Sequence, residues 1–335
     1  MTADPLAGPR DQDHVVLDDD VIVSVHGAVH PADHLIGEVV YVPDPGGSHC
    51  LFGRGYRKAY QRDGRGIAEQ KRFRICDRTD SYFDRAPMFD GKSVVHRGRV
   101  RRYVACADLF ADGDESPDNG QKEAARILWE SACRLLGITG AGLQVALTGS
   151  LNLDPHPRHV RDPNDLDLLF TGSTATVGRL AAAMSAAARE HPEIRVHEYG
   201  KGWQIRLRTA EGLLCSFFRY GDATETPLCD VTDVRTVRND VEIHGTVTSA
   251  EHNVFMPMVL EVEVEVTTAP ETVPLESRLP ILIYHLRSRG DFFQGDRGRF
   301  RGTVVEVTEG SKAYLALSVA DGTSSHLLTP PWLPY

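Results

Sequence analysis

The sequence predicts an α+β protein in which a core of mixed strands and helices is flanked by β-rich domains at both ends. Short β-branched runs broken by Pro and Gly occupy about the first 110 residues. Helical and extended patterns then alternate, and extended runs return towards the end of the chain. A chain of 335 residues is also too long for one ordinary core. We therefore expect three domains, at residues 1–112, 119–222 and 223–335.

The N-terminal domain is predicted from short extended runs such as Val21–Val25 and Gly37–Val42, which are interrupted by prolines and paired glycines. It extends to about Leu109. The stretch Ala111–Gly120 is polar, acidic and rich in turn-forming residues, so we expect it to be the linker to the core.

The core begins at Gln121, where apolar residues recur at helical spacing, with Asp118 or Asn119 as the cap and Gly137 as the end of the helix. The residues expected on the apolar stripe of this helix are Ala124, Ile127, Leu128, Ala132, Leu135 and Leu136. A short apolar strand, Leu143–Leu147, follows and leads into Thr148-Gly149-Ser150. The other expected elements are a strand at Asp165–Phe170, a helix at Ser173–Glu190 with Val177, Leu180, Ala181, Met184 and Ala188 inward, and a hairpin of Trp203–Arg208 and Leu213–Arg219.

The C-terminal domain is predicted to be a small β-barrel or sandwich. Residues Met258–Val266 alternate strictly, which places Glu261, Glu263 and Glu265 on one solvated face. The stretch Phe300–Val319 is expected to form two strands that turn at Glu309 and Gly310.

The composition is that of a soluble globular protein, with 41% hydrophobic and 25% charged residues. No apolar run has the length of a signal peptide or a membrane span, so we expect a cytoplasmic protein without a membrane partner. Six cysteines without C-x-x-C spacing argue against a zinc ribbon or a dense disulfide framework and predict reduced, mostly buried thiols.

Two motifs in the core carry the chemistry. Residues i and i+2 of a strand point to the same face, about 6–7 Å apart, so Asp165 and Asp167 can share metal ions. Gly149 lets the backbone approach phosphate without a Cβ, and Ser150 adds a hydroxyl and an amide. Either motif alone is commonly an ordinary turn. Together they predict a site that binds metal ions and a nucleoside triphosphate, since carboxylate-held Mg²⁺ neutralises polyphosphate charge.

These motifs resemble the signature of the polymerase-beta nucleotidyltransferase superfamily, matched here by the runs Ala146–Ser150 and Asn164–Phe170. The matching core covers about a third of the chain. The N-terminal segments Val25–Pro31 and Gly37–Val42 also resemble the leading segment of poorly characterised predicted nucleotidyltransferases of archaea and some bacteria.

The resemblance implies two Mg²⁺ ions on Asp165 and Asp167 and a nucleoside triphosphate held by Gly149 and Ser150. It also implies transfer of a nucleoside monophosphate to a hydroxyl acceptor with release of pyrophosphate. Members of the superfamily modify nucleic-acid ends, proteins and small molecules from one core, so the acceptor stays open.

The chain departs from the family pattern in two places. The spacer Leu151–Asn164 is longer than usual and is rich in proline and basic residues, including His156 and His159, for which a surface loop is favoured over a transition-metal site. The strand expected to carry a third carboxylate has Ser216 or Cys215 there instead, and Asp222 or Glu211 could replace it only if the strand end bends into the site. The alternative function is therefore a nucleotide- or nucleic-acid-binding module that has lost catalysis.

The net charge of −10 conceals a basic stretch between Leu51 and Arg102, with about fifteen Lys or Arg against about six Asp or Glu. This stretch tilts the expected acceptor towards nucleic acid, although a salt-bridged surface explains it equally well. A second group of basic and aromatic residues lies in the C-terminal domain. There, ordinary β-hairpins are a better explanation than the binding of single-stranded nucleic acid. The two groups are Arg54, Arg57, Lys58, Arg97, Arg99, Arg101 and Arg102 with Tyr56, Tyr60, Phe73 and Tyr103, and Arg287, Arg289, Arg297, Arg299 and Arg301 with Phe292, Phe293 and Phe300.

Overall fold

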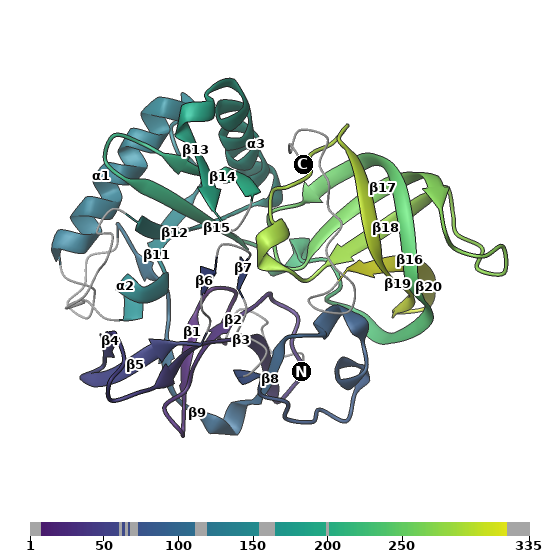
Figure 1. Cartoon of the computed structure of the whole chain (residues 1–335), viewed down its shortest axis with the longest axis horizontal. Helices are drawn as coiled ribbons and strands as arrows, with labels where there is room; N and C mark the ends of the chain where they lie inside the picture. The colour runs from purple at the N-terminus through teal and green to yellow at the C-terminus, as the bar shows by residue number, and fades with distance from the viewer. Residues whose placement is uncertain are drawn as a thin grey trace.

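The computed structural model describes residues 8–59, 62–63, 66–67, 73–110, 119–153, 165–198 and 201–319. The protein is an α+β structure dominated by strands, with 47% strand and 21% helix. An N-terminal sheet, a core sheet carrying the long helices and a C-terminal barrel pack around a common junction (Figure 1).

The N-terminal sheet has the strand order β4-β5-β3-β2-β1-β9, and β8 pairs with one end of β3. Alternate side chains along its strands, such as Val15, Val23 and Leu35, are buried in one apolar cluster, and the residues between them, such as Val16 and Ile22, are buried in a second. The strands are β1 His14–Leu17, β2 Ile22–Val25, β3 His34–Pro43, β4 His49–Leu51, β5 Arg54–Lys58, β8 Ser93–His96 and β9 Val100–Val104, with a separate hairpin of β6 Arg62–Asp63 and β7 Gly66–Ile67.

The core sheet has the order β10-β11-β12-β15-β14-β13. Only β12 and β15 run parallel, and every other neighbouring pair is antiparallel. Its strands are β10 Ala107–Asp108, β11 Gln144–Leu147, β12 Asp165–Gly172, β13 Arg195–Glu198, β14 Lys201–Arg208 and β15 Leu213–Tyr220.

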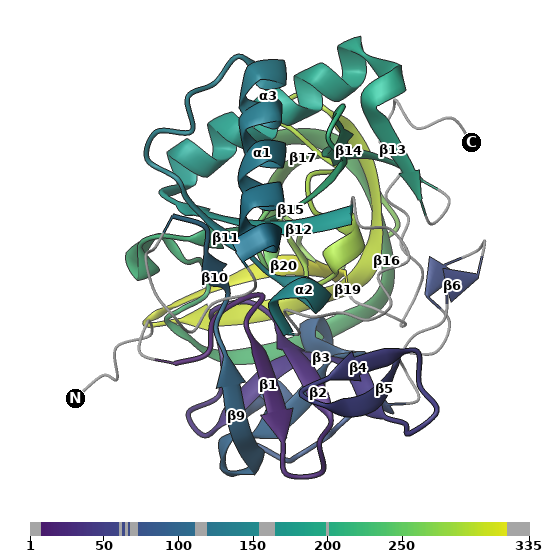
Figure 2. The same ribbon diagram turned by 90° about the vertical axis from the view of Figure 1, so that its left-hand side faces the viewer.

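Helices α1, Asn119–Leu136, and α3, Thr174–Glu190, cover one face of this sheet (Figure 2). The Ser173 hydroxyl caps α3 by accepting from the Thr176 N–H, and the five α3 residues expected to face inward are all buried. Helix α1 ends before Gly137, whose φ of +64° favours glycine. The extents of both long helices were therefore predicted correctly, except that Asn119 lies inside α1; Asp118 is outside the described residues. The predicted stripe of α1 was partly wrong, because Leu128 and Ala132 are buried but Ala124, Ile127 and Leu135 are exposed.

The C-terminal strands close into a five-stranded barrel of order β16-β17-β18-β20-β19. Strands β18 and β20 are parallel, which gives a Greek-key barrel of the OB type. Of the two forms that the sequence left open, the barrel is the one observed. Its strands are β16 Val231–His252, β17 Met258–Thr267, β18 Arg278–Ile283, β19 Arg297–Glu309 and β20 Lys312–Val319.

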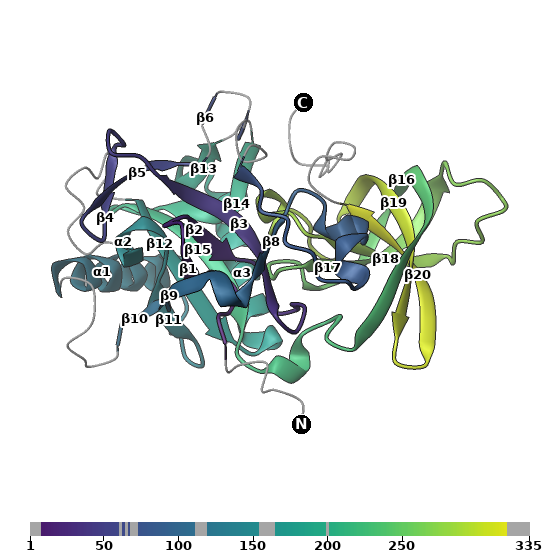
Figure 3. The same ribbon diagram turned by 90° about the horizontal axis from the view of Figure 1, so that it is seen from below.

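Two short 3-10 turns of the N-terminal region pack against the barrel. Tyr82–Asp84 and Pro87–Phe89 lie between the two bodies when the molecule is seen from below (Figure 3). Their aromatic side chains bury against barrel residues such as Tyr284, with the Phe89 and Tyr284 rings 5.1 Å apart. This apolar contact fixes the barrel on the N-terminal sheet.

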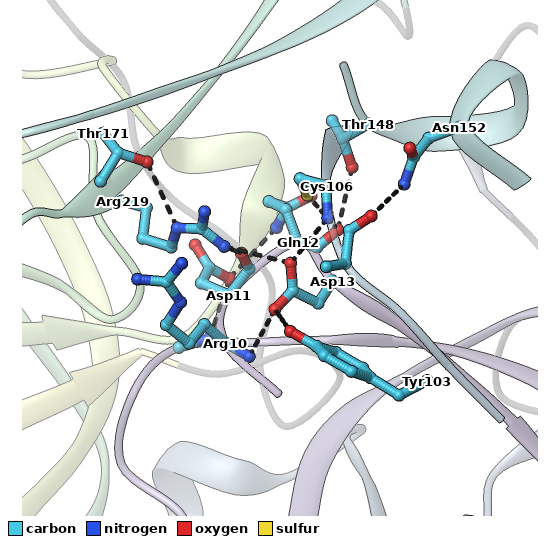
Figure 4. Close-up of polar contacts among 12 residues, drawn as sticks. Arg10, Asp11, Gln12, Asp13, Tyr103, Cys106, Thr148, Asn152, Thr171 and Arg219 are labelled. Atoms are coloured by element: carbon cyan, nitrogen blue, oxygen red, sulfur yellow. Dashed lines mark hydrogen bonds and ion pairs between the residues drawn. The ribbon is translucent and has the colours of Figure 1, made fainter. Parts of the chain in front are cut away.

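The segment Arg10–Asp13 joins the three bodies (Figure 4). Asp13 forms an ion pair with Arg219 on β15 at 3.1 Å and accepts a hydrogen bond from the Tyr103 hydroxyl at 2.6 Å. Asp11 accepts from Arg289, on the barrel side, at 2.6 Å. All four ionic groups of the Asp13–Arg219 and Asp11–Arg289 pairs are buried, so the junction is a polar core shared by the three bodies.

The border between the N-terminal and core regions differs from the expected one. Residues Ala107–Asp108 already pair with β11, and Leu109 is fully buried in the core cluster. The chain therefore enters the core sheet before the predicted linker at Ala111–Gly120, most of which lies outside the described residues. The sequence signal failed because two residues are too few to show a strand pattern.

Candidate functional site

The aspartate pair begins strand β12. Asp165 and Asp167 are half-buried, whereas Leu166 and Leu168 between and beyond them are buried under the helices. The alternation of the strand thus places both carboxylates on the face of the sheet opposite α1 and α3. These are the positions that the motif predicted, on one face and close together.

The Gly-Ser corner lies directly beside this pair. Strand β11 pairs antiparallel with β12, and the Thr148 N–H donates to the Asp167 carbonyl at 3.0 Å. Gly149 then adopts a φ of +69°, and a Cβ there would overlap the Asp167 carboxylate, with Oδ2 as its nearest atom. Only glycine allows the backbone to approach that carboxylate so closely.

Ser150 lies in the first turn of α2, Gly149–Leu153, and is half-buried. The N-terminal domain holds this short helix in place. The Asn152 amide donates to the Ala105 carbonyl at 2.9 Å, and Leu153 is buried among N-terminal residues such as Tyr41. Figure 2 shows α2 between the core sheet and the N-terminal sheet, so the position of the corner depends on both regions.

Cys215 occupies the third corner of the site. It lies opposite Asp167 in the parallel pairing of β12 with β15, and its thiol donates to Asp165 Oδ1 at 2.8 Å. One ligand atom from each of Asp165, Asp167 and Cys215 can be chosen so that all three lie within 4.8 Å of one another. Ser216, the other residue considered for this place, points to the opposite face, with its hydroxyl 3.7 Å from the Met184 sulfur.

Neither alternative carboxylate reaches the corner. Asp222 caps a 3-10 turn, Ala223–Glu225, beyond the far end of β15 and accepts from the Thr224 N–H at 2.8 Å. Glu211 is near α1, with an oxygen 4.0 Å from the Arg134 guanidinium. Among the described residues, the only cluster of His, Cys, Asp or Glu side chains with the spacing to hold a metal ion is therefore two aspartates and a cysteine.

Arg206 on β14 is a site residue that the sequence reasoning missed. It pairs with Cys215 across the β14–β15 hairpin, its side chain is 16% exposed, and its guanidinium forms an ion pair with Glu198. It also stacks over Trp203 at 4.5 Å from the ring centre. The hairpin around Ala210–Gly212 was predicted, but counting outward from that turn pairs Arg206 with Ser216. The observed register sets Arg208 opposite Leu213 and therefore Arg206 opposite Cys215.

Charge and burial act in opposite directions at this corner. Burial raises the pKa of the Cys215 thiol well above its ordinary value, Arg206 opposes this, and Asp167 and Asp165 add to it. Burial alone would lower the pKa of Arg206, but Cys215 and the surrounding carboxylates hold it above its usual value. The guanidinium therefore stays charged beside the aspartates.

Four of the seven basic residues singled out in the N-terminal domain form ion pairs with carboxylates of the same domain. Arg102 and Arg57 also lie over the rings of Phe52 and Phe73, at 4.2 and 4.7 Å. This arrangement favours the salt-bridged alternative over a free phosphate-binding surface. The ion pairs are Arg54 and Arg101 with Asp20, Arg57 with Asp44, and Arg99 with Asp18, Asp19 and Asp77.

Most of the described basic and aromatic residues singled out in the barrel domain are buried or ion-paired. Phe292 and Phe300 are fully buried, and Arg289 belongs to the junction. On the outer face of β17, Glu261 and Glu265 contact arginines instead of being simply solvated. The arginine pairs on the barrel are Arg297–Glu265, Arg299–Glu242, Arg301–Asp240 and Arg278–Glu261.

Some of the predicted features fall on residues that the structure does not describe. The spacer from Asp154 to Asn164, with His156 and His159, lies outside the described residues, and so does Tyr60.

The six cysteines are free, as expected. Cys215 alone is buried, however, and Cys76 and Cys229 are exposed, so the expectation of mostly buried thiols was wrong. Among the described helices, none combines the length and apolar character needed to cross a membrane.

No protein-family model, curated protein or solved structure matches this chain. Its function must therefore be inferred from the geometry of the corner formed by Gly149, Asp165, Asp167 and Cys215.

Proposed function

We propose that the protein is a nucleotidyltransferase that depends on a divalent cation. It would transfer a nucleoside monophosphate from a nucleoside triphosphate to a hydroxyl acceptor and release pyrophosphate. The observation that carries the proposal is the approach of Gly149 to the Asp167 carboxylate. It brings the Gly-Ser motif at the end of β11 into contact with the aspartate pair at the start of the neighbouring strand β12.

The residues fit the roles that this reaction requires. Asp165 and Asp167 offer the oxygen ligands that Mg²⁺ prefers, and a bound Mg²⁺ would neutralise the triphosphate and favour attack at the α-phosphorus. Gly149 keeps the space beside the carboxylates free of a side chain, and Ser150 offers a hydroxyl to a phosphate oxygen. Arg206 adds a permanent positive charge on the same side of the sheet.

One observation favours a second candidate, a nucleotide-binding module without turnover. The third corner holds Cys215 instead of a carboxylate that could activate the attacking hydroxyl. Such a module would bind the triphosphate in a cation-dependent way and would not release pyrophosphate. A turnover assay therefore separates the two candidates.

The proposal is tested by calorimetric titration of the full chain with each nucleoside triphosphate, in Mg²⁺, in Co²⁺ and in a chelator. We expect cation-dependent binding that Asp165→Ala and Asp167→Ala weaken by about 100-fold or more, since even changes outside a ligand shell often cost 10–100-fold. Asp222→Ala is the matched control and should bind like the wild type. Both candidates fail if neither cation supports binding, or if the two site variants bind normally.

Turnover is then followed with labelled triphosphates and a cell extract. Pyrophosphate release with transfer of label to RNA, protein or a small molecule supports the enzyme and identifies the acceptor class. Cation-dependent binding without release of pyrophosphate from any triphosphate favours the binding module.

A further inference from the structure

The donor set at the corner contains a sulfur atom. Asp165 and Asp167 supply carboxylate oxygens, and the Cys215 sulfur lies 2.8 Å from one of them. The three ligand atoms are close enough to bind one cation together, within 4.8 Å of one another. A cation at this place would meet two hard donors and one soft donor.

Apolar side chains surround Cys215, and its sulfur contacts the Asp165 carboxylate. Cys215 is 1% exposed and packs with Trp203, Val196 and Leu213, all of which are buried. Its register opposite Asp167 on the parallel neighbour β12 places its side chain on the carboxylate side of the sheet. Central strands seldom change register, so the sulfur is a fixed part of the corner.

The close approach of the backbone to the carboxylates is independent of the cysteine. Gly149 belongs to another element, and a Cβ there would overlap Asp167 Oδ2. Three carboxylates, those of Asp165, Asp167 and Glu198, share the positive charge of Arg206. The corner thus combines a close backbone approach, two carboxylates and one thiol.

Cation chemistry distinguishes this set from an all-oxygen site. Mg²⁺ takes oxygen ligands and retains water, whereas thiolate sulfur favours softer ions such as Zn²⁺. Three protein ligands with one further position left for water or substrate is the usual arrangement of a catalytic zinc site. The oxygen donors therefore fit Mg²⁺, but the third donor does not.

We propose that Cys215 is a metal ligand and that the corner binds one thiophilic divalent cation of the zinc class in preference to a pair of Mg²⁺ ions. The inference rests on the proposed function, because it assigns the cation that would hold the triphosphate. On binding, the sulfur–metal bond replaces the S–H bond, and the proton is released to the solvent. The fourth position remains available to a phosphate oxygen or to water.

The test is a titration of the full chain with Co²⁺, a spectroscopic substitute for Zn²⁺. We expect a thiolate-to-cobalt charge-transfer band that Zn²⁺ abolishes at one equivalent and that excess Mg²⁺ leaves in place. Cys215→Ser should lose the band and weaken Co²⁺ binding about tenfold or more, since it replaces the soft donor by a hydroxyl. The control Cys76→Ser removes an exposed free thiol and should keep the band. Absence of a band in the wild type, or displacement of Co²⁺ by Mg²⁺ at similar concentrations, overturns the proposal.

A second measurement needs no variant and covers the case in which Cys215→Ser does not fold. X-ray absorption of the zinc-loaded wild-type protein should show a sulfur neighbour at about 2.3 Å together with oxygen neighbours at about 2.0–2.2 Å. A shell without sulfur excludes Cys215 as a ligand. Cys215→Asp provides the opposite test, because a third carboxylate should shift the preference towards Mg²⁺.

The two proposals fail in different ways. Triphosphate binding in Mg²⁺ without a sulfur–metal signal leaves the proposed function in place and removes this inference. A sulfur–metal signal without triphosphate binding in any cation establishes the metal site and removes the proposed function.

Discussion

The chain contains the same acidic motif in two different settings. Asp11-Gln12-Asp13 at the domain junction and Asp165-Leu166-Asp167 in the core sheet both space two carboxylates by one residue. The junction pair is buried and saturated: Asp13 accepts from Arg219, Tyr103 and two backbone N–H groups, and Asp11 accepts from Arg289 and the Gly27 N–H. The core pair is half-buried and lies against Gly149 and the Cys215 thiol.

The difference shows that spacing alone does not give an aspartate pair its role. At the junction, each carboxylate has an arginine of its own, so a cation would have to displace a protein partner. At the core corner, one arginine, Arg206, acts on both aspartates and is also paired with Glu198. A carboxylate pair is a better candidate for a metal site where its members share one arginine than where each has its own.

The largest expected effect follows from removing one junction carboxylate. Asp13→Ala should lower the free energy of unfolding by about 3–5 kcal/mol, because it leaves the Arg219 charge buried without its partner. Asp167→Ala should change it by less than about 1 kcal/mol in the absence of divalent cations, because that carboxylate is half-exposed. Urea denaturation followed by circular dichroism measures both. A core variant as unstable as the junction variant would make both acid pairs structural.

The second prediction concerns the pH dependence of stability, to which a buried histidine beside the junction contributes. Burial lowers the pKa of His26, beside the junction, from 6.5 to about 4, with Glu38 and Asp11 opposing the shift and Lys92 and Arg289 supporting it. Between these values the unfolded chain binds a proton that the folded protein does not, so stability falls as the pH falls from about 6.5 to about 4. At about 1.4 kcal/mol per pKa unit, this histidine accounts for up to about 3 kcal/mol.

Denaturation at several pH values checks this dependence. His26→Gln should reduce the slope between pH 6.5 and 4, whatever its effect on absolute stability, because glutamine does not titrate. A slope remains, because burial also lowers the pKa values of His14 and His30. Asp165→Asn should leave the contribution of His26 unchanged. Identical slopes for the wild type and His26→Gln would show that His26 is not held neutral by burial.

Local patterns predicted much of the fold, and they did so where a single element carries its own signal. The helix at Ser173–Glu190 was expected with its cap and its buried face, because apolar spacing and a serine cap lie within one segment. The turn at Gly310, with φ of +57°, was likewise expected between two strands. The order of strands in the barrel was not, since the parallel pairing of β18 with β20 depends on distant segments.

The candidate site divides in the same way. The meeting of Gly149 and Asp167 was expected from the motif, and the structure places them side by side. The choice between Cys215 and Ser216 required the register of β12 against β15, which no local pattern contains. The junction was missed altogether, because Asp13 and Arg219 are 206 positions apart and their contact exists only in the folded chain.

The smallest expected effect concerns two glycines of the core with nearly the same backbone. Gly137 and Gly149 have φ of +64° and +69°, so alanine at either position should cost about 1 kcal/mol of backbone strain. A Cβ at Gly137 meets nothing within 4 Å, whereas one at Gly149 overlaps Asp167. Gly149→Ala should therefore be less stable than Gly137→Ala by about 1–2 kcal/mol and should alone lose cation and triphosphate binding. Denaturation and calorimetry of the two variants measure this, and equal binding by both would mean that the close approach at Gly149 serves only the fold.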